Sequence, residues 1–141
     1  IYKRRTHGNA NDIEINKNGI NHPLYTSKKK KFNSPAFNFD EVVSLPEGAV
    51  HLASNKVNKV QSLHFKSGLS DIWGLQYHPE ITYHKMITLI KFRKDRLIND
   101  RKCFKDDKEI QKHIDFIEQE IKVSEKESRM LEIKNWLNHL N

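Results

Sequence analysis

Residues 72–80 read IWGLQYHPE, an apolar run that ends abruptly in a histidine, a proline and a glutamate. Such a run is typical of a buried β-strand, and the apolar residues that recur every three or four positions after Thr82 are typical of an amphipathic helix. His78 is therefore expected at the carboxyl end of a strand, just before a helix. Open α/β sheets place their ligand sites there, so the stretch predicts an α/β fold with a site around His78.

The His-Pro-Glu triplet has a chemical use. Pro79 fixes its own φ angle and biases His78 toward extended geometry, which lets Glu80 turn back to the imidazole. A carboxylate that accepts the Nδ1 proton fixes the histidine tautomer and leaves Nε2 to act on a nucleophile. A surface histidine before a proline turn is the ordinary alternative for such a triplet alone. We predict His78 and Glu80 to be the catalytic residues, as the orienting half of a triad.

The rest of the chain divides into a strand-rich part, residues 10–80, and a helical part, residues 82–141. Alternating or apolar runs predict strands at 12–16, near a sheet edge, and at 50–53, 60–65 and 72–77, the last two joined by a turn at 66–68. Segment 31–39 contains Pro35, which allows a short strand at most. Helices are predicted at 82–98, 110–121 and 130–140, the last two continuous or broken near Ser124. Strands followed by helices indicate one α/β domain, 1–141, with a mixed sheet.

The composition narrows the function classes. The chain has 141 residues and a formal charge of +7, much of which lies in the basic runs 2–5 and 28–31. Neither run has interleaved aromatic residues, so we expect solvated loops rather than a nucleic-acid surface. No window approaches the roughly 18 apolar residues of a membrane helix. A single cysteine, Cys103, excludes an internal disulfide and fits a cytoplasmic protein.

The motif belongs to a longer resemblance. The segment WGLQYHPE resembles the last catalytic strand of the class I glutamine amidotransferases of the triad type. Residues 39–65, FDEVVSLPEGAVHLASNKVNKVQSLHF, resemble the stretch that precedes this strand in the family. The helix from Thr82 and the ending EIKNWLNHL, residues 132–140, are similar to a stand-alone subgroup related to the amidotransferase domain of GMP synthase. The resemblance covers nearly the whole chain and implies a flavodoxin-like domain.

This resemblance implies a function. The family hydrolyses the side-chain amide of glutamine to glutamate and ammonia through a cysteine thioester, and a synthetase or another acceptor partner uses the ammonia. His78 would be the base and Glu80 its orienting carboxylate. No cofactor is expected, and no metal either, because His64, His78 and His84 match no usual zinc spacing.

One feature departs from the family pattern. The nucleophile of this family stands in a Gly-x-Cys-x-Gly elbow well upstream of the histidine, and the 141 residues contain no such elbow. Cys103 follows the helix after His78, in the charged segment 102–105, and is expected to be an ordinary thiol. Because the chain starts at Ile1, we expect it to be the C-terminal part of the domain. Alone it would be inactive, and marginally stable or self-associating.

Two other functions stay open. The chain could be a degenerate member that serves as an inactive partner or regulatory module, which the coding DNA upstream of Ile1 would decide. Gamma-glutamyl hydrolases share the Cys-His arrangement and cut gamma-glutamyl bonds without an acceptor. Glu80 and the run from Asp40 favour the amidotransferase over the gamma-glutamyl hydrolase.

Overall fold

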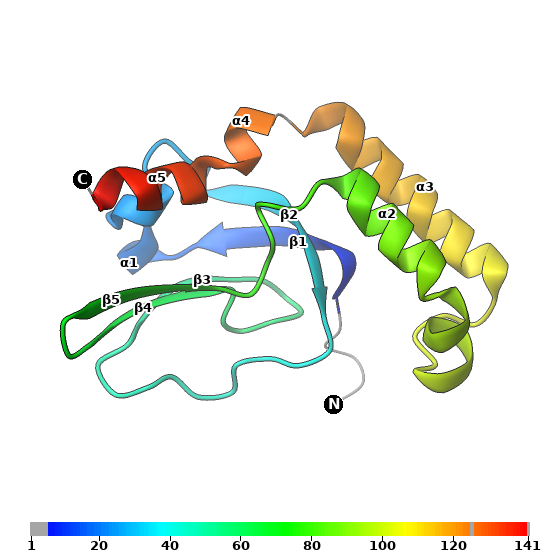
Figure 1. Cartoon of the computed structure of the whole chain (residues 1–141), viewed down its shortest axis with the longest axis horizontal. Helices are drawn as coiled ribbons and strands as arrows, with labels where there is room; N and C mark the ends of the chain where they lie inside the picture. The colour runs from blue at the N-terminus through cyan, green and yellow to red at the C-terminus, as the bar shows by residue number, and fades with distance from the viewer. Residues whose placement is uncertain (1–5, 125, 141) are drawn as a thin grey trace.

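The computed structural model describes residues 6–124 and 126–140, so the basic run 2–5 lies outside the described residues. The strands are β1 (Thr6–Ile15), β2 (Lys31–Asn38), β3 (Val50–Ser54), β4 (Ser62–Ser67) and β5 (Ser70–Leu75). The helices are α1 (Lys17–Ile20), the 3₁₀ turn η1 (Pro23–Tyr25), α2 (Tyr83–Phe92), the π turn η2 (Arg96–Asp100), α3 (Asp107–Val123), α4 (Lys126–Arg129) and α5 (Leu131–His139). Figure 1 shows them around one sheet.

The sheet has the strand order β2-β1-β3-β4-β5. The α/β class is confirmed, but each pairing between neighbouring strands in the described part of the chain is antiparallel, where we expected a mixed sheet. A parallel pair needs a crossover connection of a dozen or more residues, usually helical. The longest regular helix between β1 and β5 is the four-residue α1, so these connections suit antiparallel neighbours.

The first two strands differ from the prediction. Segment 31–39 forms the full strand β2, which pairs with β1 along its length and places Pro35 opposite Asn9. A proline is tolerated there because β2 is the edge strand of the sheet. β1 is an inner strand that contacts β3 at Glu14 and Ile15, and it lies directly beside the edge strand, which agrees with the prediction of a strand near an edge.

The β4–β5 hairpin carries the chain toward His78. The strands are paired up to Ser67 and Ser70, so the turn lies at residues 68–69, at the end of the predicted turn 66–68. Gly68 has φ +57°, a conformation that favours glycine. β5 ends at Leu75, two residues before the predicted end, yet the Gln76 amide still donates to the Gln61 carbonyl at 2.8 Å. The His78 amide then donates to the carbonyl of Pro35 in β2 at 2.7 Å. The sheet therefore curls, and the segment after β5 returns to the opposite edge strand.

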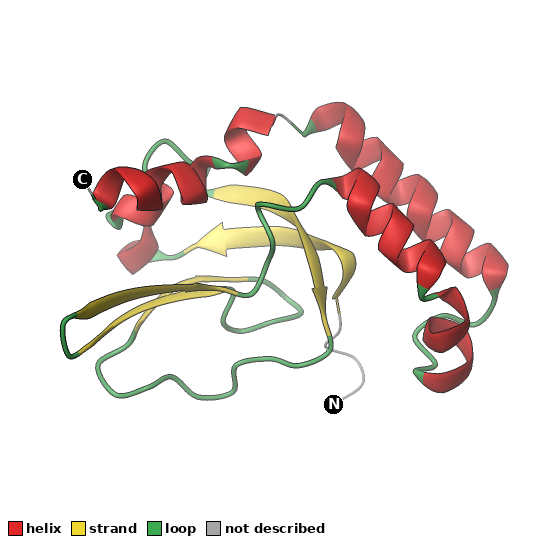
Figure 2. Cartoon of the chain, in the orientation of Figure 1, coloured by secondary structure: helices red, strands yellow, loops and turns green. Residues whose placement is uncertain are grey.

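Two hydrophobic clusters stabilise the fold. The strand cluster lies around β1, β3, η1 and Tyr77, and its buried members are Ala10, Ile13, Ile15, Leu24, Tyr25, Ala36, Leu52, Ala53 and Tyr77. The helical cluster lies between α2, α3 and η2, and its buried members are Tyr83, Ile87, Ile90, Leu97, Ile110, Ile114 and Ile117. Figure 2 shows the matching arrangement, with α2 and α3 at one end of the sheet and α1 and α5 at the other.

The helices start where capping residues stand. The Thr82 hydroxyl accepts from the Lys85 amide at 3.3 Å, which begins α2 as predicted, and Asp106 accepts from the Glu109 amide at 3.0 Å at the start of α3. α2 ends at Phe92 rather than near 98, and η2 carries Leu97 into the helical cluster. α3 ends at Val123, so the helical region is broken at Ser124.

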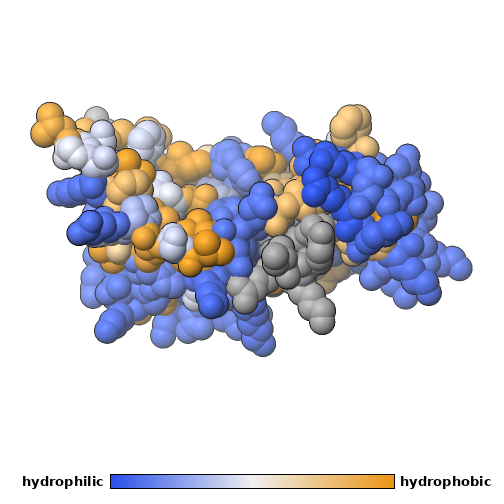
Figure 3. Space-filling view, turned by 90° about the horizontal axis from the view of Figure 1, so that it is seen from below, coloured by the Kyte–Doolittle hydropathy of each residue, from blue (hydrophilic) through white to orange (hydrophobic). Residues whose placement is uncertain are grey.

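The two ends of the molecule also differ on the surface. Seen from below, hydrophilic residues cover most of the helical end, whereas hydrophobic residues lie more openly over the end with β4 and β5 (Figure 3). Exposed apolar residues at this end include Leu69, in the β4–β5 turn, and Ile72 of β5, and Trp136 and Leu137 of α5 are exposed as well. Within the described residues, no helix is long and apolar enough to cross a membrane.

Candidate active site

His78 and Glu80 meet as the triplet predicts. His78 Nδ1 lies 2.8 Å from Glu80 Oε1, and the two side chains are 40% and 51% exposed. An ionised carboxylate can only accept, so Nδ1–H donates to Glu80, and in the neutral ring the lone pair then lies on Nε2. The buried Pro79 stands between them and keeps the turn tight. The arrangement can orient an imidazole and stabilise its protonated form.

The backbone of this turn is fixed on both sides. The His78 amide donates to Pro35 of β2, and the His78 carbonyl accepts from the Ile81 amide at 3.1 Å. Thr82 then caps α2. The imidazole thus stands between the edge of the curled sheet and the start of a helix, as the sequence predicted.

Arg129 of α4 holds the same turn from outside the strand. Its guanidinium donates to the carbonyl of Pro79 and, at 3.1 Å, to the carbonyl of Ile81. These carbonyls lie on either side of Glu80, which is the partner of His78. The C-terminal helical region therefore contacts the His-Pro-Glu turn directly.

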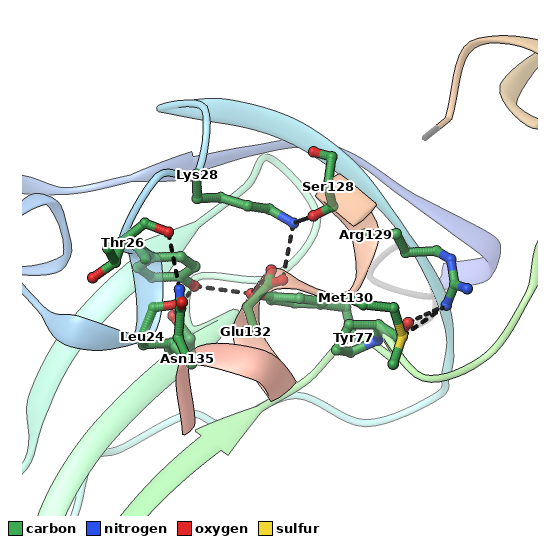
Figure 4. A network of polar contacts seen from close by, with 12 residues as sticks. Leu24, Thr26, Lys28, Tyr77, Ser128, Arg129, Met130, Glu132 and Asn135 are labelled. Atoms are coloured by element: carbon green, nitrogen blue, oxygen red, sulfur yellow. Dashed lines mark hydrogen bonds and ion pairs between the residues drawn. The ribbon is translucent and has the colours of Figure 1, made fainter. Parts of the chain in front are cut away.

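A buried polar network lies beneath this turn (Figure 4). The Tyr77 hydroxyl donates to Glu132 Oε1 at 2.9 Å, and Lys28 Nζ donates to Glu132 Oε2 at 2.9 Å and to the Ser128 carbonyl at 2.7 Å. Tyr77 also contacts the Tyr25 hydroxyl at 3.0 Å. The Lys28 and Glu132 side chains are 3% and 0% exposed, so this is a buried ion pair.

Burial changes the acid–base behaviour of this network. It lowers the pKa of Lys28, an effect that the charge and hydrogen bond of Glu132 oppose. Burial also raises the pKa of Tyr77 well above its ordinary value, so its hydroxyl remains a proton donor. The prediction that residues 28–31 form a solvated loop was wrong for Lys28. It holds for Lys30 and Lys31, whose side chains are 65% and 60% exposed.

Sequence reasoning missed this network because its members come from different elements. Lys28 stood in a charge run, and Glu132 stood beside an apolar stripe predicted to face the core. On α5 the buried residue is Glu132, whereas Leu137 and Leu140 of that stripe are 50% and 62% exposed. A glutamate at a helical position gives no local signal that it is buried.

The other histidines do not join His78. His64 and His139 both contact the carboxylate of Asp71, and the His22 ring lies 4.8 Å from the His64 ring, centroid to centroid. Burial lowers the pKa of His22, with a further lowering by the charge of His64. No group of His, Cys, Asp and Glu residues suited to a metal ion occurs in residues 6–124 and 126–140.

The cysteine lies with the helical cluster. Cys103 is partly buried against that cluster, its amide donates to the Leu97 carbonyl at 2.8 Å, and its thiol lies 3.6 Å from the Arg101 carbonyl. It belongs to the end of the molecule that holds α2 and α3.

Comparisons with known proteins identify the proteins that this chain is similar to. No protein-family model matches the chain. It is 32% identical to a gamma-glutamyl-L-1-hydroxyisopropylamide hydrolase of a Pseudomonas species, over 93% of this chain and 49% of that protein. A shorter match, 37% identical, is to a glutamine-hydrolysing GMP synthase subunit of Methanosarcina acetivorans, and it covers 33% of this chain and 23% of that protein.

Solved structures extend the likeness. The crystal structure of a glutamine amidotransferase from Thermotoga maritima superposes with a TM-score of 0.58 and 18% identity, over 98% of this chain and 53% of that one. The chain thus spans about half the length of this structure and of the Pseudomonas relative. The curled sheet, the His-Pro-Glu turn and these likenesses together show that the chain has a class I glutamine amidotransferase fold, the family that its sequence resembles.

Proposed function

We propose that the protein carrying this chain hydrolyses the gamma-amide bond of glutamine, releasing glutamate and ammonia. The observation that carries the proposal is the 2.8 Å contact between His78 Nδ1 and Glu80 Oε1 in a turn whose backbone is bonded to β2 and capped by α2. His78 acts as general base toward a cysteine nucleophile, and Glu80 holds the imidazole and stabilises its protonated form. The reaction consumes one water and needs no cofactor.

The cysteine of this reaction is the remaining part of the proposal. Cys103 packs into the helical cluster, so the proposal assigns the nucleophile to a residue outside the 141 positions. Without that residue, the chain alone carries the base and its orienting carboxylate. We propose that a synthetase or another ammonia acceptor is the partner, which the name of the Methanosarcina relative supports.

A second candidate is the hydrolysis of an N-substituted gamma-glutamyl amide, which releases an amine in place of ammonia. The Pseudomonas relative favours it, because its name states this activity and its likeness spans 93% of the chain. The two candidates share the bond that is cut and the residues that cut it. They differ in the leaving group. His78 would protonate the departing amide nitrogen, which leaves as ammonia in one case and as an amine in the other.

The test offers the protein that carries this chain glutamine and gamma-glutamyl isopropylamide as separate substrates. Ammonia, isopropylamine and glutamate are measured with time. We expect His78→Ala to abolish release from whichever substrate is cut, and Glu80→Gln to slow it by at least about a hundredfold, because a neutral amide stabilises the imidazolium poorly. Exposed His84, on the first turn of α2, provides the matched control His84→Ala.

The outcomes separate the functions. Faster release from glutamine supports the amidotransferase, and faster release from the substituted amide supports the second candidate. A folded protein that cuts neither substrate overturns both and leaves the inactive partner or regulatory module. Unchanged rates in His78→Ala would assign the reaction to other residues.

A further inference from the structure

The turn that presents His78 is anchored to the C-terminal helical region. Residues 76–81 lie between β5 and α2 and belong to neither. Their backbone is held at Gln76 by Gln61 and at His78 by Pro35, whereas the side chain of Tyr77 and the carbonyls on either side of Glu80 are held by residues of α4 and α5. The His-Pro-Glu turn is thus attached to the sheet through its backbone and to the helices through Tyr77 and Arg129.

Tyr77 is held at its hydroxyl by more than one partner. Its hydroxyl donates to Glu132 at 2.9 Å and lies 3.0 Å from the hydroxyl of Tyr25, which in turn contacts Ser62 at 2.6 Å. Its ring packs edge-on against Phe32, with the centroids 5.6 Å apart. Tyr77 and His78 are adjacent in the chain, so a Tyr77 side chain that is held at its hydroxyl and at its ring also restricts the backbone that carries His78. A rotation of the segment that moved the imidazole would have to break these contacts.

Glu132 is fixed in turn. Both of its oxygens are used, one by Tyr77 and one by Lys28, and its side chain is fully buried. α5 is joined to η1 by Asn135, which donates to the carbonyls of Leu24 at 2.9 Å and Thr26 at 3.0 Å (Figure 4). A buried charge pair is costly to desolvate and contributes little net stability. Its value lies in allowing only one arrangement of the groups that it joins, which is what a catalytic turn requires.

We propose that Tyr77, Glu132 and Arg129 are positioning residues for the amide hydrolysis proposed above. Tyr77 and Glu132 fix the segment after β5 that carries His78, and Arg129 fixes the turn that brings Glu80 to the imidazole. This inference rests on the proposed function for its kinetic consequence, but the geometry of the His78–Glu80 contact can be measured without turnover.

The kinetic test uses Tyr77→Phe and Glu132→Gln in the protein that carries this chain. Each variant retains nearly the size of the side chain and weakens the Tyr77–Glu132 bond. We expect kcat to fall about tenfold or more, since small displacements of a catalytic group cost that much, while KM stays within about twofold. The matched control is Tyr83→Phe, which removes another buried tyrosine hydroxyl, the one that donates to Asn9 at 2.8 Å. It should leave kcat unchanged.

The spectroscopic test follows the imidazole nitrogens of His78 by NMR, assigned with His78→Gln. In the wild-type protein we expect the neutral imidazole to carry its proton on Nδ1, the nitrogen that faces Glu80. In Tyr77→Phe and in Arg129→Gln we expect mixed tautomers, with the wild-type signals retained in Tyr83→Phe. If Glu132→Gln does not fold, the double variant Lys28→Met, Glu132→Leu replaces the charge pair by apolar groups and still removes the acceptor of Tyr77.

The results distinguish this inference from the proposed function. If the wild-type protein cuts no amide, the proposed function is overturned. Altered His78 signals in Tyr77→Phe or Arg129→Gln would still support the positioning in that case. Wild-type kcat and wild-type His78 signals in folded Tyr77→Phe and Glu132→Gln proteins would overturn the positioning, whatever the substrate. A kcat loss of the same size in Tyr83→Phe would also overturn it, because the effect would then come from a general loosening of the core.

Discussion

The two ends of the molecule are held together by different chemistry. The helical cluster consists mainly of isoleucines from α2 and α3, with Ile90 and Ile117 fully buried. The strand cluster is apolar as well, but at its boundary with α5 it contains the hydroxyls of Tyr25 and Tyr77 and the pair Lys28–Glu132. Apolar contacts are non-directional, whereas hydrogen bonds between buried charged groups accept few geometries.

The His-Pro-Glu turn lies where these two ends meet. It leaves the strand cluster at Tyr77 and enters the helical cluster at Tyr83. On the positioning proposed above, the helical end contributes stability without fixing the imidazole, and the polar boundary fixes the imidazole at a cost in desolvation. Substitutions in the two ends of the molecule test this division.

Breaking the buried pair should have the largest effect on stability. Lys28→Met leaves Glu132 charged and buried without its cation, which costs about 3–5 kcal/mol of unfolding free energy. Urea denaturation of the protein that carries this chain measures it. The control Lys30→Met removes a 65% exposed lysine whose carboxylate partner Glu14 is 4.0 Å away, and should change stability by less than about 0.5 kcal/mol. Equal losses in both variants would mean that Lys28 is solvated after all.

Opening a cavity in the helical cluster should cost nearly as much. Ile117→Ala removes buried methyl groups between α3 and the sheet, which lowers the unfolding free energy by about 2–5 kcal/mol. Its neighbour Phe116 is 45% exposed, so Phe116→Ala should cost clearly less. We expect Ile117→Ala to keep the wild-type NMR signals of His78, which would separate the stability of the helical end from the position of the imidazole. Changed signals would show that the helical end also fixes the imidazole.

Removing the cap of α3 should have a smaller effect. Asp106 accepts from the Glu109 amide at 3.0 Å, and Asp106→Ala should cost about 1 kcal/mol. Asp107, whose side chain is 68% exposed in the first turn, makes a suitable control as Asp107→Ala, with a loss of a few tenths of a kcal/mol expected from the helix dipole and from its exposed ion pair with Lys94 at 3.2 Å. Thermal unfolding followed by circular dichroism would compare them, and a larger loss in Asp107→Ala would contradict the capping role.

The smallest effect should be a pH dependence at His22. Burial lowers its pKa from the ordinary 6.5, so as the pH falls below that value the unfolded chain binds the proton before the folded chain does. Stability is therefore lost as the pH falls from about 6.5 through the lowered pKa. His64, Asp71 and His139 face the same cluster, and their charges act on the pKa of His22.

His22→Asn isolates that contribution. The side-chain oxygen of asparagine can still accept from the Leu24 amide, as His22 Nδ1 does at 3.2 Å. Unlike histidine, asparagine binds no further proton between pH 7 and pH 5. We expect unfolding measured between pH 7 and pH 5 to show a smaller loss in the variant than in the wild type. Parallel curves for both proteins would assign the acid sensitivity to the other groups of the cluster.

The sequence predicted well what adjacent residues decide. The β4–β5 hairpin follows from alternation and a glycine turn, the start of α2 follows from Thr82, and the contact between His78 and Glu80 follows from the proline between them. Each depends on a few consecutive residues, whose geometry is limited by φ restriction and hydrogen bonding.

Features set by distant partners were missed. β2 is longer than predicted because its pairing with β1 outweighs the local effect of Pro35 at an edge. Lys28 and Glu132 are buried because each finds the other across 104 positions, which no local pattern reveals. The prediction of which face of α5 is buried was also wrong. Glu132, paired with Lys28, is buried there, whereas Leu137 of the predicted apolar stripe is half exposed.

That sequence separation has a consequence for folding. Closing a chain over about a hundred residues is entropically costly, so contacts such as Lys28 to Glu132 are expected to form after the β4–β5 hairpin. α5, with its exposed leucines, is also a natural place for local opening below the global unfolding barrier. Release of α5 would remove Glu132 from the Tyr77 hydroxyl while the sheet persisted, so the order of the His-Pro-Glu turn would report whether the last helix is docked.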